Sequence, residues 1–162
     1  MTVGLIEKSK MGGTGLHVGC IPTKALLHSA EVADVTRESA KYGVTSTFGG
    51  IEIAGVTKYR EDIVASKYKG LQGLIKARGI TTIEGAGRLT SPTTVQVGDD
   101  VITGKNVVLA TGSYSRSLPG LETGGRVIPS ALALPPDFLP RKCLVPGARF
   151  MGWGCWRVQQ RR

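Results

Sequence analysis

The residue best placed for chemistry is Cys20, which opens a stretch with helical periodicity. Backbone N–H groups at a helix N-terminus stabilise the negative charge of a thiolate, so this position favours a reactive cysteine. Lys24 follows one helical turn later on the same face, and its charge would support either the thiolate or an anionic ligand. Cysteine is also commonly buried as a small apolar residue, so the residues alone leave both interpretations open.

A partner thiol is missing where one could reach Cys20. The position five residues upstream is Gly15, and closing an internal disulfide requires two thiols. The other two cysteines, Cys143 and Cys155, lie far along the chain, and nothing in the sequence indicates that either replaces the absent thiol. The sequence therefore raises the question of whether Cys20 is half of a redox pair whose other half is gone.

A second signal comes from Glu7, which ends the short apolar run of residues 2–7. An acid just past a buried strand accepts ribose hydroxyls in dinucleotide-binding βαβ units. A surface acid beside Lys8 is the plainer interpretation, because the glycine loop of such a unit belongs about 20 residues upstream of the acid.

The segment between these two signals, residues 8–19, is rich in glycine, and we expect it to be a loop. Gly12 and Gly13 allow a backbone to approach a ligand closely, and Thr14 can donate a hydrogen bond to a phosphate. Most glycine pairs of this kind are simply turns, so the segment is a weak signal by itself.

Hydrophobic periodicity predicts the elements that must position these residues. Helical spacing predicts a helix over residues 20–42, with Pro22 in its first turn and Gly43 as its stop, and a second over residues 56–78, ended by Gly79. A loop with a possible short strand is expected over residues 46–55. Short strands are predicted over residues 2–7, 80–84, 94–97, 100–103, 106–110 and 142–145.

Length and composition favour one soluble, cytoplasmic α/β domain. The chain has 162 residues, of which 41% are hydrophobic and 23 are glycine, and no apolar run approaches the roughly 18 residues of a membrane span. The first residues do not have the pattern of a signal peptide. Three cysteines, an odd number, argue against a secreted disulfide scaffold.

The net charge of +9 is concentrated at one end. Residues 141–162 hold six basic and no acidic residues, which leaves 15 basic against 12 acidic, a net of +3, for residues 1–140. A nucleic-acid interface could use this tail with Trp153 and Trp156 as stacking groups, but the tail is short and contains no recognised module. The near-neutral body favours a small-molecule enzyme.

Four separate runs, in order, resemble the flavin-dependent pyridine nucleotide–disulfide oxidoreductases. The run GGTGLHVGCIPTKALLHSAEV (residues 12–32) resembles their redox-active segment and is most similar to the dihydrolipoyl dehydrogenase branch. IEGAGRL, VVLATGSYSRSLPGLE and VIPSALALPPDFLPRK continue the similarity, which covers about residues 2–145.

The resemblance implies an α/β fold: a partial FAD-binding Rossmann-like domain with a long helical hairpin and a small antiparallel β-sheet, its first βα unit missing before Met1. Residues 1–140 would form this domain. Residues 141–162 would be a degenerate start of the NAD-binding domain, or a basic tail. There Arg149 replaces the middle glycine of the GxGxxG loop, and its side chain would block close approach to a pyrophosphate.

The resemblance also implies roles for single residues. Cys20 would be the catalytic thiol that faces the flavin, with its partner position vacant at Gly15. Glu7 would bind the adenosine ribose of FAD, and Lys24 would lie near the flavin. The other residues implied in cofactor binding are Lys8, Gly12, Gly13, Thr14, Gly87, Ala110, Thr111, Gly112 and Ser113.

The family reaction passes two electrons from dihydrolipoamide, on a carrier protein of a 2-oxoacid dehydrogenase complex, through a cysteine pair and FAD to NAD+. The intact family members are homodimers, with no membrane or metal involved. This chain departs from the pattern at Gly15, and at His17, where the family usually has asparagine. Two hypotheses follow: an impaired fragment of such an enzyme, or a redox-inactive flavin-binding or interaction module.

Overall fold

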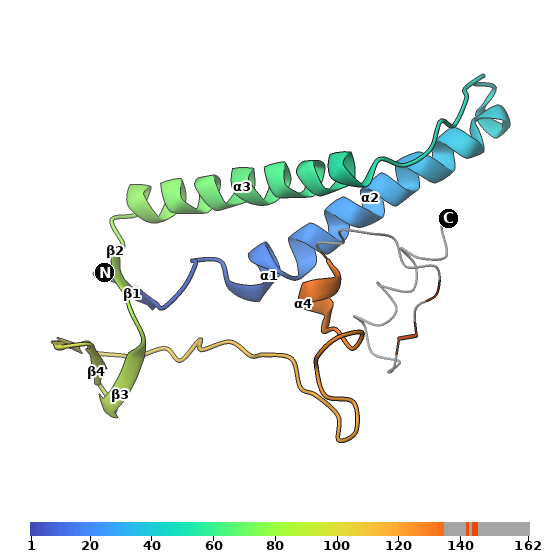
Figure 1. Ribbon diagram of the computed structural model, residues 1–162. Coiled ribbons are helices and arrows are strands. Elements are labelled where there is room, and N and C mark those ends of the chain that lie inside the picture. The colour runs from blue at the N-terminus through green and yellow to red at the C-terminus, as the bar shows by residue number, and fades with distance from the viewer. Residues whose placement is uncertain (135–141, 143, 146–162) are drawn as a thin grey trace. The chain divides into compact units, whose positions relative to one another are not determined.

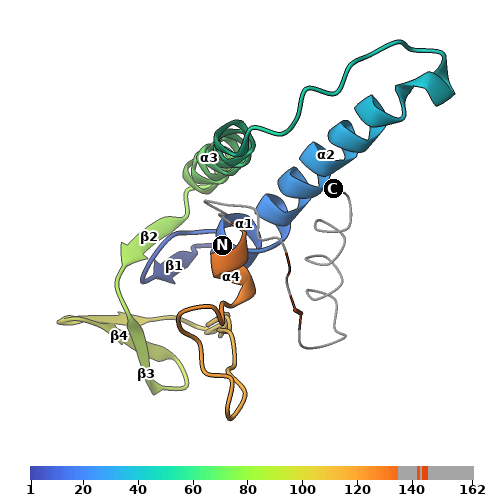
Figure 2. The same cartoon turned by 45° about the vertical axis from the view of Figure 1, so that its right-hand side comes forward.

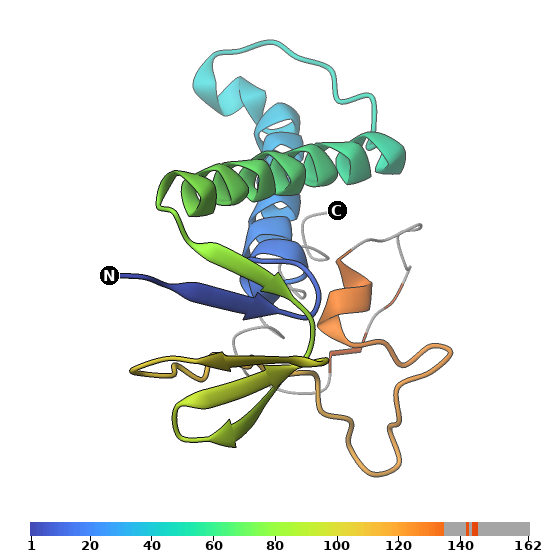
Figure 3. The same ribbon diagram turned by 90° about the vertical axis from the view of Figure 1, so that its left-hand side faces the viewer.

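The computed structural model describes residues 1–134, 142 and 144–145, and its parts appear from three directions in Figures 1, 2 and 3. The chain divides into two compact units. The first unit comprises Met1–Gly13 and Lys67–Ser113, and the second comprises Thr14–Ser66 and the described residues from Tyr114 onward. Among the described residues, no helix is both long and apolar enough to cross a membrane.

The first unit contains a pair of parallel strands, β1 (Gly4–Glu7) and β2 (Thr81–Glu84). Their register pairs Gly4 with Thr81 and Glu7 with Glu84. The pairing continues past the strand ends, where the Gly85 N–H donates to the Glu7 carbonyl at 3.0 Å. Parallel strands need a long crossover connection, and this one includes the helices that follow β1.

A three-stranded antiparallel sheet completes the first unit. Its strands are β3 (Gly87–Ser91), β4 (Thr94–Val97) and β5 (Asp100–Thr103), in the order β3-β4-β5. The sequence predicted β4 and β5 with these bounds. It did not predict β3, because four of its five residues are exposed and it has no alternating apolar face.

Two glycines, one in the turn after β2 and one at the start of β3, allow this small sheet to pack closely. Gly85 has φ 144°, and a Cβ added there would lie 2.5 Å from Val97 Cγ1. A Cβ added to Gly87 would lie 3.0 Å from Val95 Cγ1 and 3.2 Å from Ile6 Cγ2. Both positions therefore need a residue without a side chain, because a methyl group would push β4 or β1 away.

The second unit is helical. It contains α1 (Gly13–His17), α2 (Cys20–Arg37), the 3-10 helix η1 (Ser39–Tyr42), the first half of α3 (Ile53–Ala77) and α4 (Ser130–Ala133). The buried residues of α2 are Pro22, Ala25, Leu26 and Ala33. Where α3 crosses α2, the rings of His28 and Tyr59 lie 6.4 Å apart between centroids. The predicted helical hairpin is confirmed.

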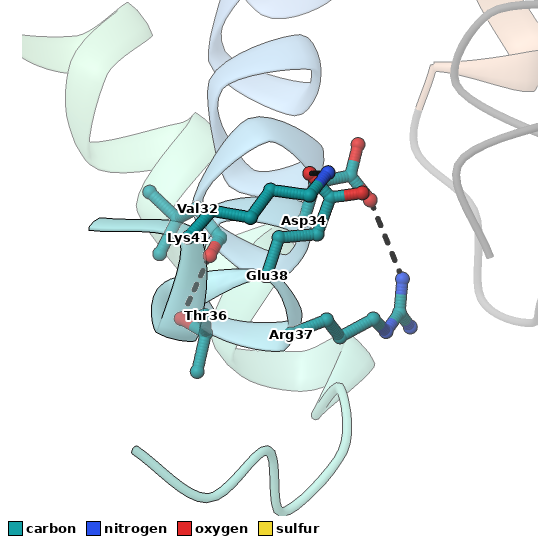
Figure 4. A network of polar contacts seen from close by, with 6 residues as sticks. All are labelled: Val32, Asp34, Thr36, Arg37, Glu38 and Lys41. Atoms are coloured by element: carbon teal, nitrogen blue, oxygen red, sulfur yellow. Dashed lines mark hydrogen bonds and ion pairs between the residues drawn. The ribbon is translucent and has the colours of Figure 1, made fainter. Parts of the chain in front are cut away.

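Local ion pairs support the exposed end of α2 (Figure 4). Arg37 Nη1 lies 3.4 Å from Asp34 Oδ1, and Lys41 Nζ donates to Glu38 Oε2 at 2.8 Å. This hydrogen bond and the opposite charge lower the pKa of Glu38 and raise the pKa of Lys41. Both groups are exposed, so water screens the pair and its contribution to stability is small. Gly43, with φ 71°, ends the helical segment as predicted.

Several sequence expectations differ from the structure. Residues 8–19 are not all loop, because α1 forms within them despite two glycines. Residues 46–55 contain no strand, and α3 begins at Ile53, three residues earlier than predicted. Residues 106–110 are not a buried strand, since they pair with no strand among the described residues, and Val108 and Leu109 are 85% and 68% exposed.

The last of these errors has a clear physical reason. An apolar run becomes a strand only when a neighbouring strand accepts and donates its backbone hydrogen bonds, which periodicity cannot reveal. The predicted strand over residues 142–145 is also not observed: Lys142, Leu144 and Val145 are outside any strand, and Cys143 lies outside the described residues.

Substitution of Gly85 by alanine tests the packing of the small sheet. We expect Gly85→Ala to lower the free energy of unfolding by about 2–4 kcal/mol, because the new methyl group meets Val97 and φ is positive. Gly98→Ala is the matched control: its φ is 58° and its Cβ would meet no atom within 4 Å, so only backbone strain of about 1–2 kcal/mol remains. Urea denaturation measures both, and equal losses would contradict the packing.

Candidate functional site

Cys20 is exposed and is the first residue of α2, as the sequence predicted. Gly19, the N-cap residue, forms no side-chain hydrogen bond, and Pro22 has no N–H to offer. The first turn of an α-helix leaves its N–H groups without intrahelical acceptors. Cys20 and Ile21 therefore carry the N–H groups at the helix start, where the helix dipole favours a negative charge.

Gly19 fixes how α1 meets the start of α2. It is buried, and a Cβ added to it would lie 2.8 Å from the carbonyl oxygen of Thr14 and 3.3 Å from the carbonyl carbon. The same Thr14 oxygen accepts a hydrogen bond from the Val18 N–H at 3.0 Å. Thr23 also contributes, because its N–H and its Oγ1 both donate to the Gly19 carbonyl, at 3.0 and 2.7 Å. We call this connection between α1 and the start of α2, formed by Thr14, Gly19 and Thr23, the joint.

Gly15 occupies an open position in α1. The residue is exposed, and a Cβ added there would meet no atom within 4 Å. Its φ lies outside the positive region, so a residue with a side chain fits without backbone strain. Its neighbour Thr14 touches Gly19, the residue that precedes Cys20, which places α1 against the start of α2.

Lys24 lies in α2, four residues after Cys20, and its side chain is exposed. Residues four apart on a helix share a face. Among the described residues Lys24 forms no ion pair, so its charge is available beside the first turn of α2 for a thiolate or for an anionic ligand.

The end of β1 holds the predicted acid in a defined position. Glu7 Oε1 accepts a hydrogen bond from the Ser9 N–H at 2.9 Å, which fixes the carboxylate over the following turn. The Glu7 carbonyl accepts the Gly85 N–H, so strand pairing holds the backbone as well. After the exposed Lys8, Gly12 and Gly13 have φ 104° and 56°, conformations that favour glycine.

The structure brings some of the predicted site residues close together, whereas others lie outside these groups. In the first unit, Gly87 lies against Ile6, beside Glu7. In the second unit, Thr14, Gly15, Cys20 and Lys24 gather at the junction of α1 and α2. Residues 110–113 belong to the first unit but are exposed and outside any helix or strand.

Residues 1–155 match the family described as pyridine nucleotide-disulphide oxidoreductase. The chain belongs to this family. It is 34% identical over 158 residues to leghemoglobin reductase of Vigna unguiculata, covering 93% of this chain and 30% of the relative. It is 35% identical over 166 residues to dihydrolipoyl dehydrogenase of Bacillus subtilis, covering 94% of this chain and 35% of the relative. The chain thus spans about a third of the length of such relatives.

A solved structure supports the fold of this disulphide oxidoreductase chain. LpdA from Mycobacterium tuberculosis superposes with a TM-score of 0.70 at 20% identity, over 86% of this chain and 32% of that protein. The fold is therefore the Rossmann-like FAD-binding region of the family, with its small antiparallel sheet and the α2–α3 hairpin.

Each unit contains described residues that suit a part of the FAD that the family implies. The Glu7 carboxylate is an acceptor for ribose hydroxyls and is already held by Ser9. The N–H groups at the start of α2, with Lys24 on the same face, suit an anionic group. Sequence patterns predicted neither α1 nor the close packing at Gly19. The one available signal was that a glycine directly precedes the cysteine at the start of the predicted helix.

Restoring a thiol at position 15 tests the junction of α1 and α2. We expect Gly15→Cys to close a disulfide with Cys20 under mild oxidation, seen as the loss of both thiols in a thiol assay with monomeric intact mass. Gly19→Ala in the same background should slow this closure, because its methyl group pushes Thr14 away.

Gly49→Cys is the matched control, since that glycine also has open space around an added Cβ, in the loop before α3. It should keep both thiols under the same conditions. Closure that is equally fast in the Gly49→Cys variant, or absent in the Gly15→Cys variant, would contradict the proximity of α1 to the start of α2.

Proposed function

We propose that this chain is the FAD-binding part of a dihydrolipoyl dehydrogenase, an NAD-dependent oxidoreductase, and that its redox step is impaired. The observation that carries the proposal is the exposed Cys20 at the start of α2, one turn from Lys24, with an open position at Gly15. The relatives named dihydrolipoyl dehydrogenase support the choice of enzyme.

Each predicted residue has a part in the proposal. Glu7 binds the adenosine ribose, while Lys8, Gly12, Gly13 and Thr14 line the pyrophosphate and the flavin. Cys20 is the thiol on the flavin side, and Lys24 keeps a positive charge near it. Gly87 lies at the adenine end, and residues 110–113 return the chain toward the cofactor. When bound, FAD supplies two-electron transfer between thiols and a nicotinamide.

The impairment follows from electron and proton balance. Oxidation of dihydrolipoamide to its cyclic disulfide releases two electrons and two protons, which an enzyme disulfide accepts by opening to two thiols. A chain with Cys20 and Gly15 has no internal disulfide to open at this place. A nicotinamide can still exchange electrons with bound FAD without a cysteine pair, so only the lipoamide half of the reaction is lost.

The remaining family properties belong to the same proposal. The substrate is dihydrolipoamide on a carrier protein of a 2-oxoacid dehydrogenase complex, the intact protein is a homodimer, and its compartment is the cytoplasm. Residues 1–140 form the FAD-binding part, and residues 141–162 begin an NAD-binding domain that Arg149 makes degenerate, or form a basic tail.

The experiment uses a full-length dihydrolipoyl dehydrogenase framework carrying residues 1–134 of this chain. We expect dihydrolipoamide oxidation to rise at least about 10³-fold on Gly15→Cys, the scale on which loss of a covalent-catalysis residue acts. Diaphorase activity, the transfer of electrons from NADH to a dye, should change less than about tenfold. Equal effects on both activities would contradict the assigned roles of positions 15 and 20.

A redox-inactive flavin-binding or interaction module is the second candidate, favoured by the glycine at position 15, five residues before Cys20. Such a module keeps the FAD contacts of Glu7 and the helix start without turnover. Purified protein that is incubated with FAD and then separated from unbound FAD by gel filtration should keep flavin absorbance and show no diaphorase activity. A colourless protein after this separation would exclude the flavin-binding form.

A further inference from the structure

Arg60 in α3 is the one buried charged residue in the part of the chain that the structure describes, with 9% of its surface exposed. Burying a charge is costly unless hydrogen bonds compensate for the lost water. Arg60 Nη1 donates to the carbonyl of Leu134 at 3.1 Å, and Nη2 donates to Glu61 Oε1 at 2.8 Å. The first of these bonds spans 74 residues of sequence and is itself buried.

The acceptor lies at the end of a very short helix. Leu134 is the C-cap residue of α4, which has four residues and follows the N-cap residue Pro129, where no side chain forms a capping hydrogen bond. A helix of this length is not stable alone in water, because nucleation costs more than its few hydrogen bonds return. The guanidinium of Arg60 compensates at the C-terminus, where carbonyls lack partners and the dipole favours a positive charge.

α4 ends a long exposed segment, residues 114–134, which we call the strap. Residues 114–128 are exposed, and their local order includes two isolated bridges, Leu118 with Leu121 and Gly124 with Val127. Burial begins only at the end of the strap, where Leu134 is 5% exposed. Among the described residues, the bond from Arg60 is the hydrogen bond that joins the strap to α2 or α3.

We propose that Arg60 is a latch that holds the strap on α3 and that its release frees α4 without unfolding α2 and α3. While the guanidinium donates to Leu134, α4 is folded and docked. When the bond opens, α4 loses its C-terminal partner and unfolds with the strap as one local unit.

Hydrogen exchange of the full 162-residue chain tests the latch. The amides of Leu132, Ala133 and Leu134 bond to Pro129 and Ser130 inside α4, so their protection reports docking. In Arg60→Met, which keeps the aliphatic length, we expect these amides to exchange about 10- to 100-fold faster, the effect of losing a charged hydrogen bond. The amides of α2 should keep their rates.

Lys58→Met is the matched control, two residues earlier on α3, where an exposed lysine pairs with Asp62. It should leave α4 exchange unchanged. Arg60→Lys keeps the positive charge but lacks the planar guanidinium group. It should accelerate amide exchange by an intermediate amount, and only in α4. Unchanged α4 exchange in Arg60→Met would overturn the proposal, and so would equal acceleration in α2, since Arg60 would then support the whole helical unit.

Discussion

The contact on which the candidate site depends is the close approach of the Thr14 carbonyl to Gly19. A side chain at position 19 would lie 2.8 Å from that oxygen, so α1 reaches the start of α2 only because none is present. The joint holds the first turn of α2, and with it Cys20, in a fixed relation to α1. The same principle operates in the first unit, where Gly85 and Gly87 allow the small sheet to pack against its neighbours.

The chemistry of the site follows from this joint. Cys20 is exposed beside the N–H groups of a helix start and shares a helix face with Lys24, an arrangement that suits an anionic group. Gly15 faces open space in the helix that the joint holds in place.

Sequence patterns predicted the helix ends and strands that depend on residues close together in the chain. The start of α2 at Cys20, the αL stop at Gly43 and the strands β4 and β5 follow from periodicity and turn residues. Contacts between distant segments were missed. The steric need for glycine at position 85 and the burial of Arg60 against Leu134 depend on residues 12 and 74 positions away, which no local pattern shows.

The most direct test of the central claim, that Cys20 has no partner thiol with which to store electrons, is an anaerobic reductive titration of the FAD-loaded protein. A flavin accepts two electrons and a disulfide accepts two more. With Gly15 in place, we predict that full reduction with dithionite consumes about two electrons per FAD. Consumption of about four electrons per FAD would show that a second redox pair exists and would contradict the claim.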